Sequence, residues 1–380
     1  MTASRPSQGR RAYLVLLLLA AVDASGYSVI APVIPAIARA THVGGGVTGA
    51  LVACFGFGQL VGLVLGGLFL GRRSTAALLG VSLGLVMVGD IGFIAGHGLA
   101  VYFPTRVLQG IGASGLWLGV TIGVVERFPD RGLPRLMGIL TAYSVGGVVG
   151  PVLGAVGGIR GPFIAHFLLL ALCLAWVGQL GAPRVRVAAD RRAGLRDIRS
   201  GPFLIASMGV LTVATDLATL EGPLPVHLAV KLTQAQIGFL YTGAALTLGI
   251  SAMASARLPQ RGCIAAGVVI AGAGVTLLGV SGDLGLWIGA VAVTGLGLGL
   301  AEGGSLGLLV GSSDGEGIIL VTALWSQFWA GGYLFGSALS GVAVARLGFG
   351  AAGVVPMVIA ILTLALLVSR ARARGAESAT

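Results

Sequence analysis

Residues 12–35 read AYLVLLLLAAVDASGYSVIAPVIP, an apolar run that contains a single acid, Asp23. A helix needs about 20 such residues to cross a bilayer. Eleven further continuous apolar runs follow, at residues 47–70, 74–95, 100–125, 135–157, 162–182, 202–228, 236–256, 262–281, 284–311, 317–345 and 349–369. Membrane β-strands would instead alternate apolar and polar residues. The sequence therefore predicts an all-α integral membrane protein with twelve transmembrane helices.

The overall composition supports this prediction. Of 380 residues, 56% are hydrophobic, 10% are charged and 66 are glycines, and the mean hydropathy is +0.98. A soluble domain has about a quarter of its residues charged. Twelve spans leave little chain for any soluble domain, so an attached enzyme is not expected.

The net charge of +11 is explained by the positions of the basic residues. With a cytoplasmic amino terminus, 19 of the 24 basic residues fall on the inner side of the membrane and four on the outer side, while Arg106 lies inside a span. Membrane proteins carry this excess of Lys and Arg on their cytoplasmic side. We expect both termini to be cytoplasmic, and no nucleic-acid partner is needed to explain the charge.

The chain is predicted to divide into two similar halves. An Arg-rich linker at 183–201 separates a six-helix bundle at 1–182 from a second at 202–380. Asp23 is followed nine residues later by Pro32, and Asp216 is followed nine residues later by Pro225. Transporters are often built from such internal repeats. We therefore expect two pseudo-symmetric bundles.

Several motifs resemble those of the major facilitator superfamily, and within it the twelve-span drug:proton antiporters. Residues 106–113 read RVLQGIGA, similar to the family's R-x-x-Q-G-x-G-A motif, and span 1 places an acid before a proline pair. The resemblance covers essentially the whole chain, and it implies two six-helix bundles around a central cavity. One departure is the loop at 66–73, which reads GGLFLGRR and lacks the aspartate of the family's G-x-L-x-D-R-x-G-R-R pattern.

Ionisable residues inside the spans are the candidates for proton coupling and for the substrate cavity. A charge at the bilayer centre is costly, so such residues face a cavity or a partner. Burial favours the neutral form of a carboxylic acid, which lets the acid bind and release protons near neutral pH. The candidates are Asp23, Arg106, Asp216, Glu221 and Glu302.

The single basic residue inside a span, Arg106, needs a carboxylate or water beside it. We expect Asp23 to pair with it, because spans 1 and 4 line the central cavity in the resembling family. A pair that breaks when Asp23 is protonated would be a switch, whereas a permanent structural pair is the alternative. Asp90 is expected to be structural, and His166 to be an ordinary core residue.

Two further groups of residues carry hypotheses about movement and binding. Span 5 contains a motif associated with antiport, in which glycines allow close helix packing and a proline bends the helix: Gly146, Gly150, Pro151 and Gly154. Span 11 repeats aromatic residues every four positions, which places them on one helix face: Trp325, Trp329 and Tyr333. These rings could line the cavity for an amphipathic or cationic substrate, or pack in the core or against lipid.

The leading hypothesis is a secondary transporter that exports small organic compounds, cationic or neutral, in exchange for protons. No G-x-x-x-x-G-K-[ST] loop occurs, so ATP is not expected to drive it, and no cofactor or metal is implied. A sugar or metabolite facilitator or symporter is the alternative within transport. A membrane receptor or enzyme is the alternative of another class. We expect the protein to be a monomer. We expect it in a bacterial cell membrane, since the chain has one Lys and 23 Arg and is rich in Ala and Gly.

The predicted orientation can be tested by cysteine labelling. In a cysteine-free background, single cysteines at Ser4, Ala193 and Ser378 should resist an impermeant thiol reagent in intact cells, because all three positions are predicted to be cytoplasmic. A cysteine at Gly45 should be labelled. Labelling of any of the first three from outside would contradict the orientation.

Overall fold

The structure is a computed structural model that describes residues 6–70, 74–128, 132–180, 198, 200–312 and 318–377. Most of the predicted 183–201 linker lies outside these residues, as do Arg72, Arg73, Ser4, Ala193 and Ser378. The division of the chain at that linker therefore stays a prediction.

Helices make up almost all of the described chain, and each predicted span coincides with one helix or with a pair of helices. The first seven are α1 (Pro6–Ser28), α2 (Ile30–Thr41), α3 (Gly45–Leu70), α4 (Thr75–Ala95), α5 (Leu99–Arg127), α6 (Gly132–Gly154) and α7 (Arg160–Val177). The others are α9 (Gly201–Glu221), α10 (Leu224–Leu228), α11 (Gln234–Ser255), α12 (Gln260–Val280), α13 (Leu284–Gly311), α14 (Ile318–Leu347) and α15 (Val354–Glu377). Short 3₁₀ turns, η2 (Gly178–Leu180) and η3 (Phe349–Ala351), complete the set.

The predicted all-α membrane fold is confirmed. Eleven segments of the described residues are long and apolar enough to cross a membrane, and α6 contributes a shorter apolar stretch, Gly138–Gly154. Two of the predicted spans, 12–35 and 202–228, each consist of two helices, α1 with α2 and α9 with α10.

Proline explains both breaks. The first span breaks after Ser28, four residues before Pro32, and the other breaks after Glu221, four residues before Pro225. Proline has no N–H, so the carbonyl four residues earlier receives no helical hydrogen bond. The breaks fall at equivalent places, and Asp23 and Asp216 each lie five residues before the end of their helix.

The described helices gather into two compact units. The first unit consists of Met1–Thr41, Cys54–Ala188 and Leu232–Thr242, and the second of His42–Ala53, Ala189–Lys231 and Gly243–Thr380. The start of α3 belongs to the second unit and the rest of α3 to the first. The start of α11 belongs to the first unit and the rest of α11 to the second.

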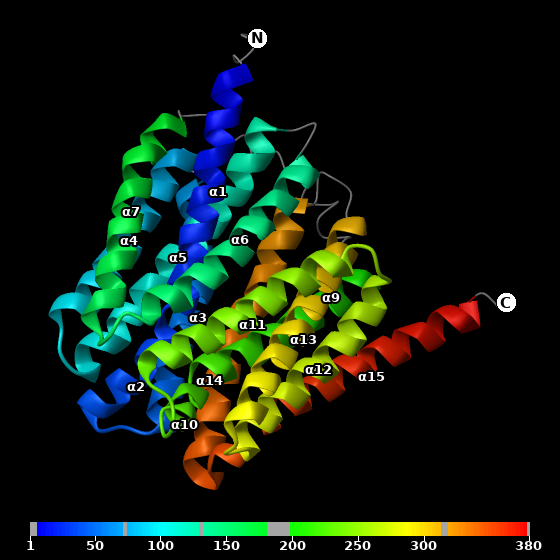
Figure 1. The fold of residues 1–380 in the computed structure, drawn as a ribbon. Helices are drawn as coiled ribbons and strands as arrows, with labels where there is room; N and C mark the ends of the chain where they lie inside the picture. Colours follow the sequence, from blue (N-terminus) through cyan, green and yellow to red (C-terminus); the bar gives the residue numbers. More distant parts are fainter. Residues whose placement is uncertain are drawn as a thin grey trace. The chain divides into compact units, whose positions relative to one another are not determined.

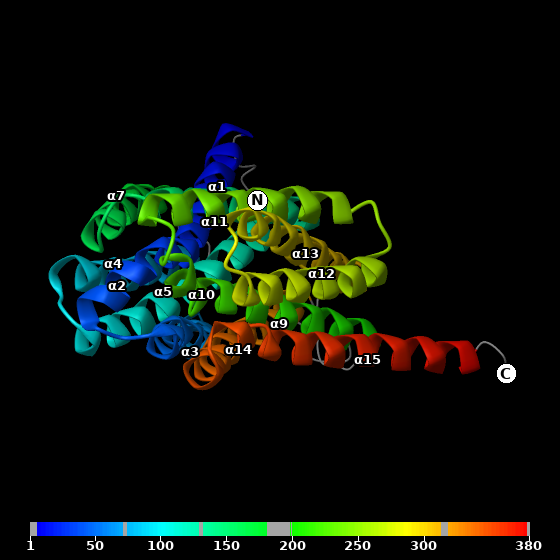
Figure 2. The same ribbon diagram turned by 60° about the horizontal axis from the view of Figure 1, so that its bottom comes forward.

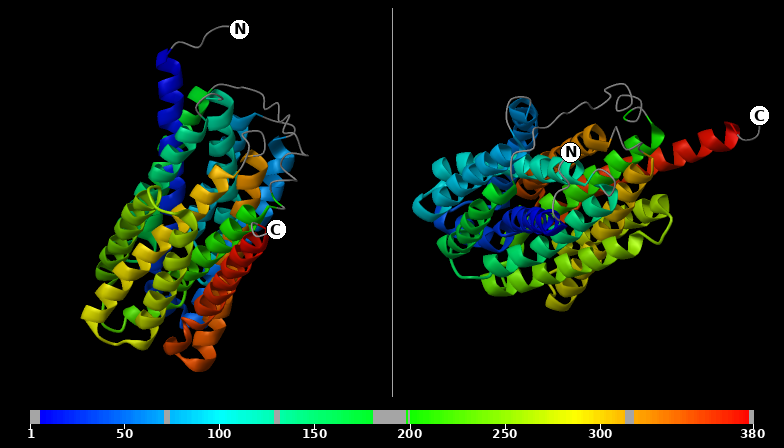
Figure 3. Two further views of the ribbon diagram at one scale, coloured as in Figure 1. Left: turned by 90° about the vertical axis from the view of Figure 1, so that its right-hand side faces the viewer. Right: turned by 90° about the horizontal axis from the view of Figure 1, so that it is seen from above.

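In the first unit, α1 packs against α5, α6 and α7, while α4 packs against α5 and α7. Leu16, Leu19, Leu116 and Leu170 belong to the apolar core between these helices. Figure 1 labels the helices, and the left view of Figure 3 shows the dark-blue α1 running beside α6.

In the second unit, α9 packs against α12, α13, α14 and α15. Ile205, Val213, Ile264 and Leu298 lie in the apolar core of this unit. Helices α12 and α13 contact each other extensively and run side by side in Figure 2.

Glycines set the distance between α1 and α6. A Cβ atom at Gly146 would overlap the carbonyl oxygen of Ala21, and one at Gly150 would lie 2.6 Å from that of Ser25. These separations are shorter than any van der Waals contact, so larger residues cannot occupy the two positions without moving the helices apart. The predicted close-packing role of the span 5 glycines agrees with this geometry.

The starts of α3 and α11 are each joined by hydrogen bonds to other residues of their own unit. In the first unit, Gln234 Nε2 of α11 donates to the carbonyl of Gly154 over 2.8 Å and to that of Gly158 over 2.9 Å. In the second unit, Ser337 Oγ donates to the carbonyl of Gly49 in α3 over 2.9 Å.

The role of the α6 glycines can be tested with two neighbouring positions. Gly146→Ala should destabilise the protein by about 1–3 kcal/mol, because the added methyl group forces a backbone shift. Gly147 is the matched control, since a Cβ there meets nothing within 4 Å. Gly147→Ala should leave stability unchanged or raise it by about 0.4–1 kcal/mol. Thermal unfolding in detergent measures both, and equal midpoints for the two variants would contradict the packing argument.

Candidate functional site

The acid of the first span lies buried between α1 and α6. Asp23 is 4% exposed, and the hydroxyl of Tyr143 in α6 donates a hydrogen bond to its Oδ2. Tyr143 lies one turn before Gly146, on the part of α6 that approaches α1 most closely. The glycine packing therefore brings this hydroxyl within reach of the carboxyl group.

Aromatic rings extend from this acid towards Arg106. The Tyr143 ring meets Tyr27 with centroids 6.4 Å apart, and Tyr27 meets Phe55 at 4.7 Å. The guanidinium carbon of Arg106 lies 4.3 Å from the centre of the Phe55 ring, a cation–π geometry. Trp117 also meets Tyr143 in an edge-to-face contact, with centroids 5.2 Å apart.

The hydrogen bonds of Arg106 lead to Asp90. Arg106 is fully buried, and its Nη1 donates to Gln109 Oε1 over 2.9 Å. Gln109 Nε2 in turn donates to Asp90 Oδ1 over 2.7 Å. The predicted pairing of Arg106 with Asp23 stays a prediction.

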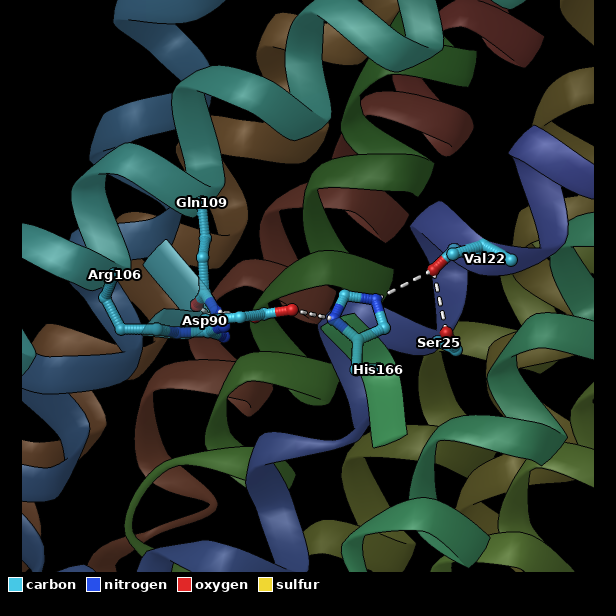
Figure 4. Close-up of polar contacts among 6 residues, drawn as sticks. All are labelled: Val22, Ser25, Asp90, Arg106, Gln109 and His166. Atoms are coloured by element: carbon cyan, nitrogen blue, oxygen red, sulfur yellow. Dashed lines mark hydrogen bonds and ion pairs between the residues drawn. The ribbon is translucent and has the colours of Figure 1, made fainter. Parts of the chain in front are cut away.

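The second carboxylate oxygen of Asp90 faces a histidine. His166 Nδ1 lies 2.8 Å from Asp90 Oδ2, and its Nε2 lies 3.2 Å from the carbonyl oxygen of Val22. Ser25 Oγ donates to the same carbonyl over 2.7 Å. Figure 4 shows the ring held between the acid and α1. His166, expected to be an ordinary core residue, is thus part of a polar network.

The second unit contains another pairing of acid and tyrosine. The Tyr333 hydroxyl of α14 donates to Glu221 Oε2 at the end of α9, and both side chains are buried. Trp329 stacks on Tyr333 with centroids 5.0 Å apart and ring planes 12° apart. Trp325 instead donates through Nε1 to Ser305 Oγ of α13 over 3.1 Å. Of the three predicted aromatic residues, Trp329 and Tyr333 therefore gather at a predicted acid.

The remaining two predicted acids lie in different surroundings. Asp216 is fully buried on α9, and its two carboxyl oxygens have no hydrogen-bond partner among the described residues. An ionised carboxylate without a partner is very costly in an apolar interior, so this position suits a neutral carboxylic acid. Glu302 on α13 is partly exposed.

The structure adds residues that the sequence did not single out. Tyr27, Phe55, Trp117 and Tyr143 surround the first acid or connect it to Arg106. A sequence signal existed for two of them, because Tyr27 follows Asp23 by one helical turn and Tyr143 precedes Gly146 by one. Among the described residues, no cluster of three His, Cys, Asp or Glu side chains could hold a metal ion.

Two helical units with buried acids and a buried arginine, in spans that can cross a membrane, define a polytopic membrane transporter. The family model of the Major Facilitator Superfamily matches residues 16–230. The chain belongs to this superfamily.

Similar proteins include bacterial drug exporters. The chain is 27% identical over 237 residues to Multidrug resistance protein 1 of Bacillus subtilis, a match that covers 60% of this chain and 61% of that protein. It is 26% identical over 130 residues to the quinolone resistance protein NorA of Staphylococcus aureus, covering 34% of each. The matched regions therefore span less than two thirds of these relatives.

The fold resembles that of solved transporters over nearly the whole chain. The crystal structure of a bacterial homologue of the human lysosomal transporter Spinster, inward-facing and unoccupied, superposes with a TM-score of 0.78 at 12% identity. The superposition covers 97% of this chain and 98% of that one. The predicted layout of twelve helices in two bundles is consistent with this likeness.

The contact between Glu221 and Tyr333 can be measured with a double-mutant cycle. Hydrogen bonds to charged groups contribute about 1.5–3 kcal/mol, so Glu221→Gln and Tyr333→Phe should show a coupling energy of that order in thermal unfolding. Trp325→Phe is the control partner, because Trp325 contacts Ser305. It should combine additively with Glu221→Gln. A coupling energy of zero for the first pair would contradict the hydrogen bond.

Proposed function

We propose that this chain is a proton-coupled exporter of small organic compounds, which works by alternating access in a bacterial cell membrane. The observation that carries this proposal is the pair of buried acids, Asp23 and Asp216, at equivalent places in the two halves. Acids inside spans mark proton and substrate pathways in transporters. The drug-resistance names of the similar bacterial proteins support export as the direction.

Asp23 is the acid that we assign to coupling. It is buried, and Tyr143 donates to it, so its carboxylate can accept a hydrogen bond when ionised. Its helix packs directly on α6, through the glycines at 146 and 150. Protonation of Asp23 changes the charge at this contact, and a change in charge at a packed helix contact can bias two arrangements of the helices.

The preferred substrates are cationic or neutral and amphipathic. Four predicted acids, Asp23, Asp216, Glu221 and Glu302, accompany one buried arginine. Aromatic faces, such as that of Trp329 beside Tyr333 and Glu221, suit the apolar and cationic parts of such a molecule. A proton gradient supplies the energy, with no cofactor, and the protein acts as a monomer with both termini in the cytoplasm.

Replacing Asp23 by Asn tests the proposal, because Asn mimics the protonated acid with little change of shape. In proteoliposomes with an acidic interior, the variant should still bind substrate, and it should fail to concentrate substrate when the pH difference is the sole energy source. A pH dye and a fluorescent cationic substrate report proton and substrate movement together.

Asp283→Asn provides the matched control. Asp283 caps α13 through a hydrogen bond from the Leu286 N–H at 2.9 Å, and Asn caps helices equally well. It should transport like the wild type. If Asp23→Asn exchanged protons for substrate as fast as the wild type, Asp216 or Glu302 would be the coupling acid. Wild-type transport that ignored the pH gradient would favour a facilitator, and a preference for anions would contradict the charge argument.

A further inference from the structure

The network around His166 joins four helices of the first unit. Arg106 and Gln109 belong to α5, Asp90 to α4, His166 to α7 and Val22 to α1. All four of its side chains are at most 2% exposed. None of these four side chains is the acid that we assign to coupling, so the chemistry of the network needs a separate explanation.

The partners determine where the hydrogens lie. A carbonyl oxygen can only accept, so His166 Nε2 carries a hydrogen and donates it to Val22. A guanidinium can only donate, so the Gln109 amide oxygen faces Arg106 and its NH₂ group faces Asp90. Asp90 Oδ1 therefore accepts from Gln109, and only Oδ2 remains for the histidine ring.

One shared proton must lie between His166 Nδ1 and Asp90 Oδ2. These atoms are 2.8 Å apart, and without a proton their lone pairs would repel each other. With the proton on the ring the pair is an imidazolium and a carboxylate, and with it on the oxygen both groups are neutral. The net charge of the pair is zero in either form. Loss of the proton would leave a negative charge buried away from water, which is very costly.

The other charged or titratable groups near the ring or at the end of its network come from three other helices. They are Asp23 on α1, Tyr143 on α6 through its bond to Asp23, and Arg106 on α5 at the far end of the network. Because the pair with its proton is neutral, it adds no net charge beside Asp23. The pair can therefore keep its proton while Asp23 gains and loses one.

The ring also fixes the position of α1. A Cβ atom at Gly26 would lie 3.0 Å from Cε1 and 3.1 Å from Nε2 of His166, so the helix backbone rests against the imidazole. The carbonyl that the ring binds belongs to Val22, the residue before Asp23. On its other side the ring contacts Asp90. Asp90 is connected through Gln109 to the guanidinium of Arg106.

We propose that Asp90 and His166 hold a resident proton that is not transported, and that His166 is a positioning residue that fixes α1 beside Asp23 and orients Arg106. The positioning part rests on the proposed function, because it assumes that Asp23 is the coupling acid. The resident proton does not depend on transport.

Nuclear magnetic resonance of the full-length protein, with ¹⁵N-labelled histidine, tests the resident proton directly. The chain has four histidines, and His166→Gln assigns the His166 signal. Between about pH 6 and 8, where an exposed imidazole titrates, the His166 ring signals should stay constant, with a far-downfield proton shared by Nδ1. A His166 ring whose signals changed over this pH range, or that lacked the Nδ1 proton, would overturn the proposal.

Asp90→Asn separates a resident proton from a transported one. The Asn oxygen can accept from Gln109 and its NH₂ group can donate to Nδ1 of a neutral His166, so every hydrogen bond and the zero charge are kept without a shared proton. The number of protons exchanged per substrate in proteoliposomes should equal that of the wild type. A lower number would show that the pair carries a transported proton and would overturn the proposal.

His166→Ala tests the positioning role. It removes the link between α1 and Asp90 and should slow pH-driven uptake by about tenfold or more, the effect of losing a buried hydrogen bond to a charged group. His97→Ala, at an exposed position, is the control and should keep the wild-type rate. Wild-type uptake by His166→Ala would contradict positioning. If the wild-type protein showed no proton coupling, the proposed function would fail, while the ring signals would still decide whether the proton is resident.

Discussion

The close approach of α6 to α1 is the contact on which the site of the first unit depends. It requires glycine at 146 and 150, because a side chain there would overlap the α1 backbone. Tyr143 lies on the same face of α6, and only at this distance does its hydroxyl reach Asp23. The interior of a membrane offers a carboxyl group no water as a hydrogen-bond partner. The packing of the two helices therefore determines which hydrogen bond the acid can form.

Both halves pair a buried carboxyl group with a tyrosine, but the residues that form the pair differ between them. Each places an acid five residues before a proline-induced helix break, and each provides a tyrosine from another helix to a buried carboxyl group. In the first half the tyrosine meets the acid inside the helix, Asp23. In the second half it meets Glu221 at the helix end, and the carboxyl oxygens of Asp216 have no hydrogen-bond partner among the described residues. This asymmetry is a physical reason to assign different roles to the halves of a pseudo-symmetric protein.

The buried arginine illustrates how a low-dielectric interior orders polar groups. Arg106 is held by Gln109 and by the face of Phe55. The NH₂ group of Gln109 donates a hydrogen bond to one oxygen of Asp90, and the other oxygen of Asp90 faces His166. Each group in the series is oriented by its neighbour, because an unsatisfied donor or acceptor in this environment would be costly. Such a network ties four helices of the first unit together without any covalent link.

The sequence by itself determined the all-α membrane fold and the number of spans, because the length of an apolar run is a local property set by the thickness of the bilayer. It also identified the superfamily, the acids and the glycines of span 5. The pairing of side chains was decided only by the tertiary structure. Tyr143 and Asp23 are 120 residues apart, and His166 and Asp90 are 76 apart. No local pattern specifies such contacts, because the packing of helices that are distant in the chain determines which polar group meets which.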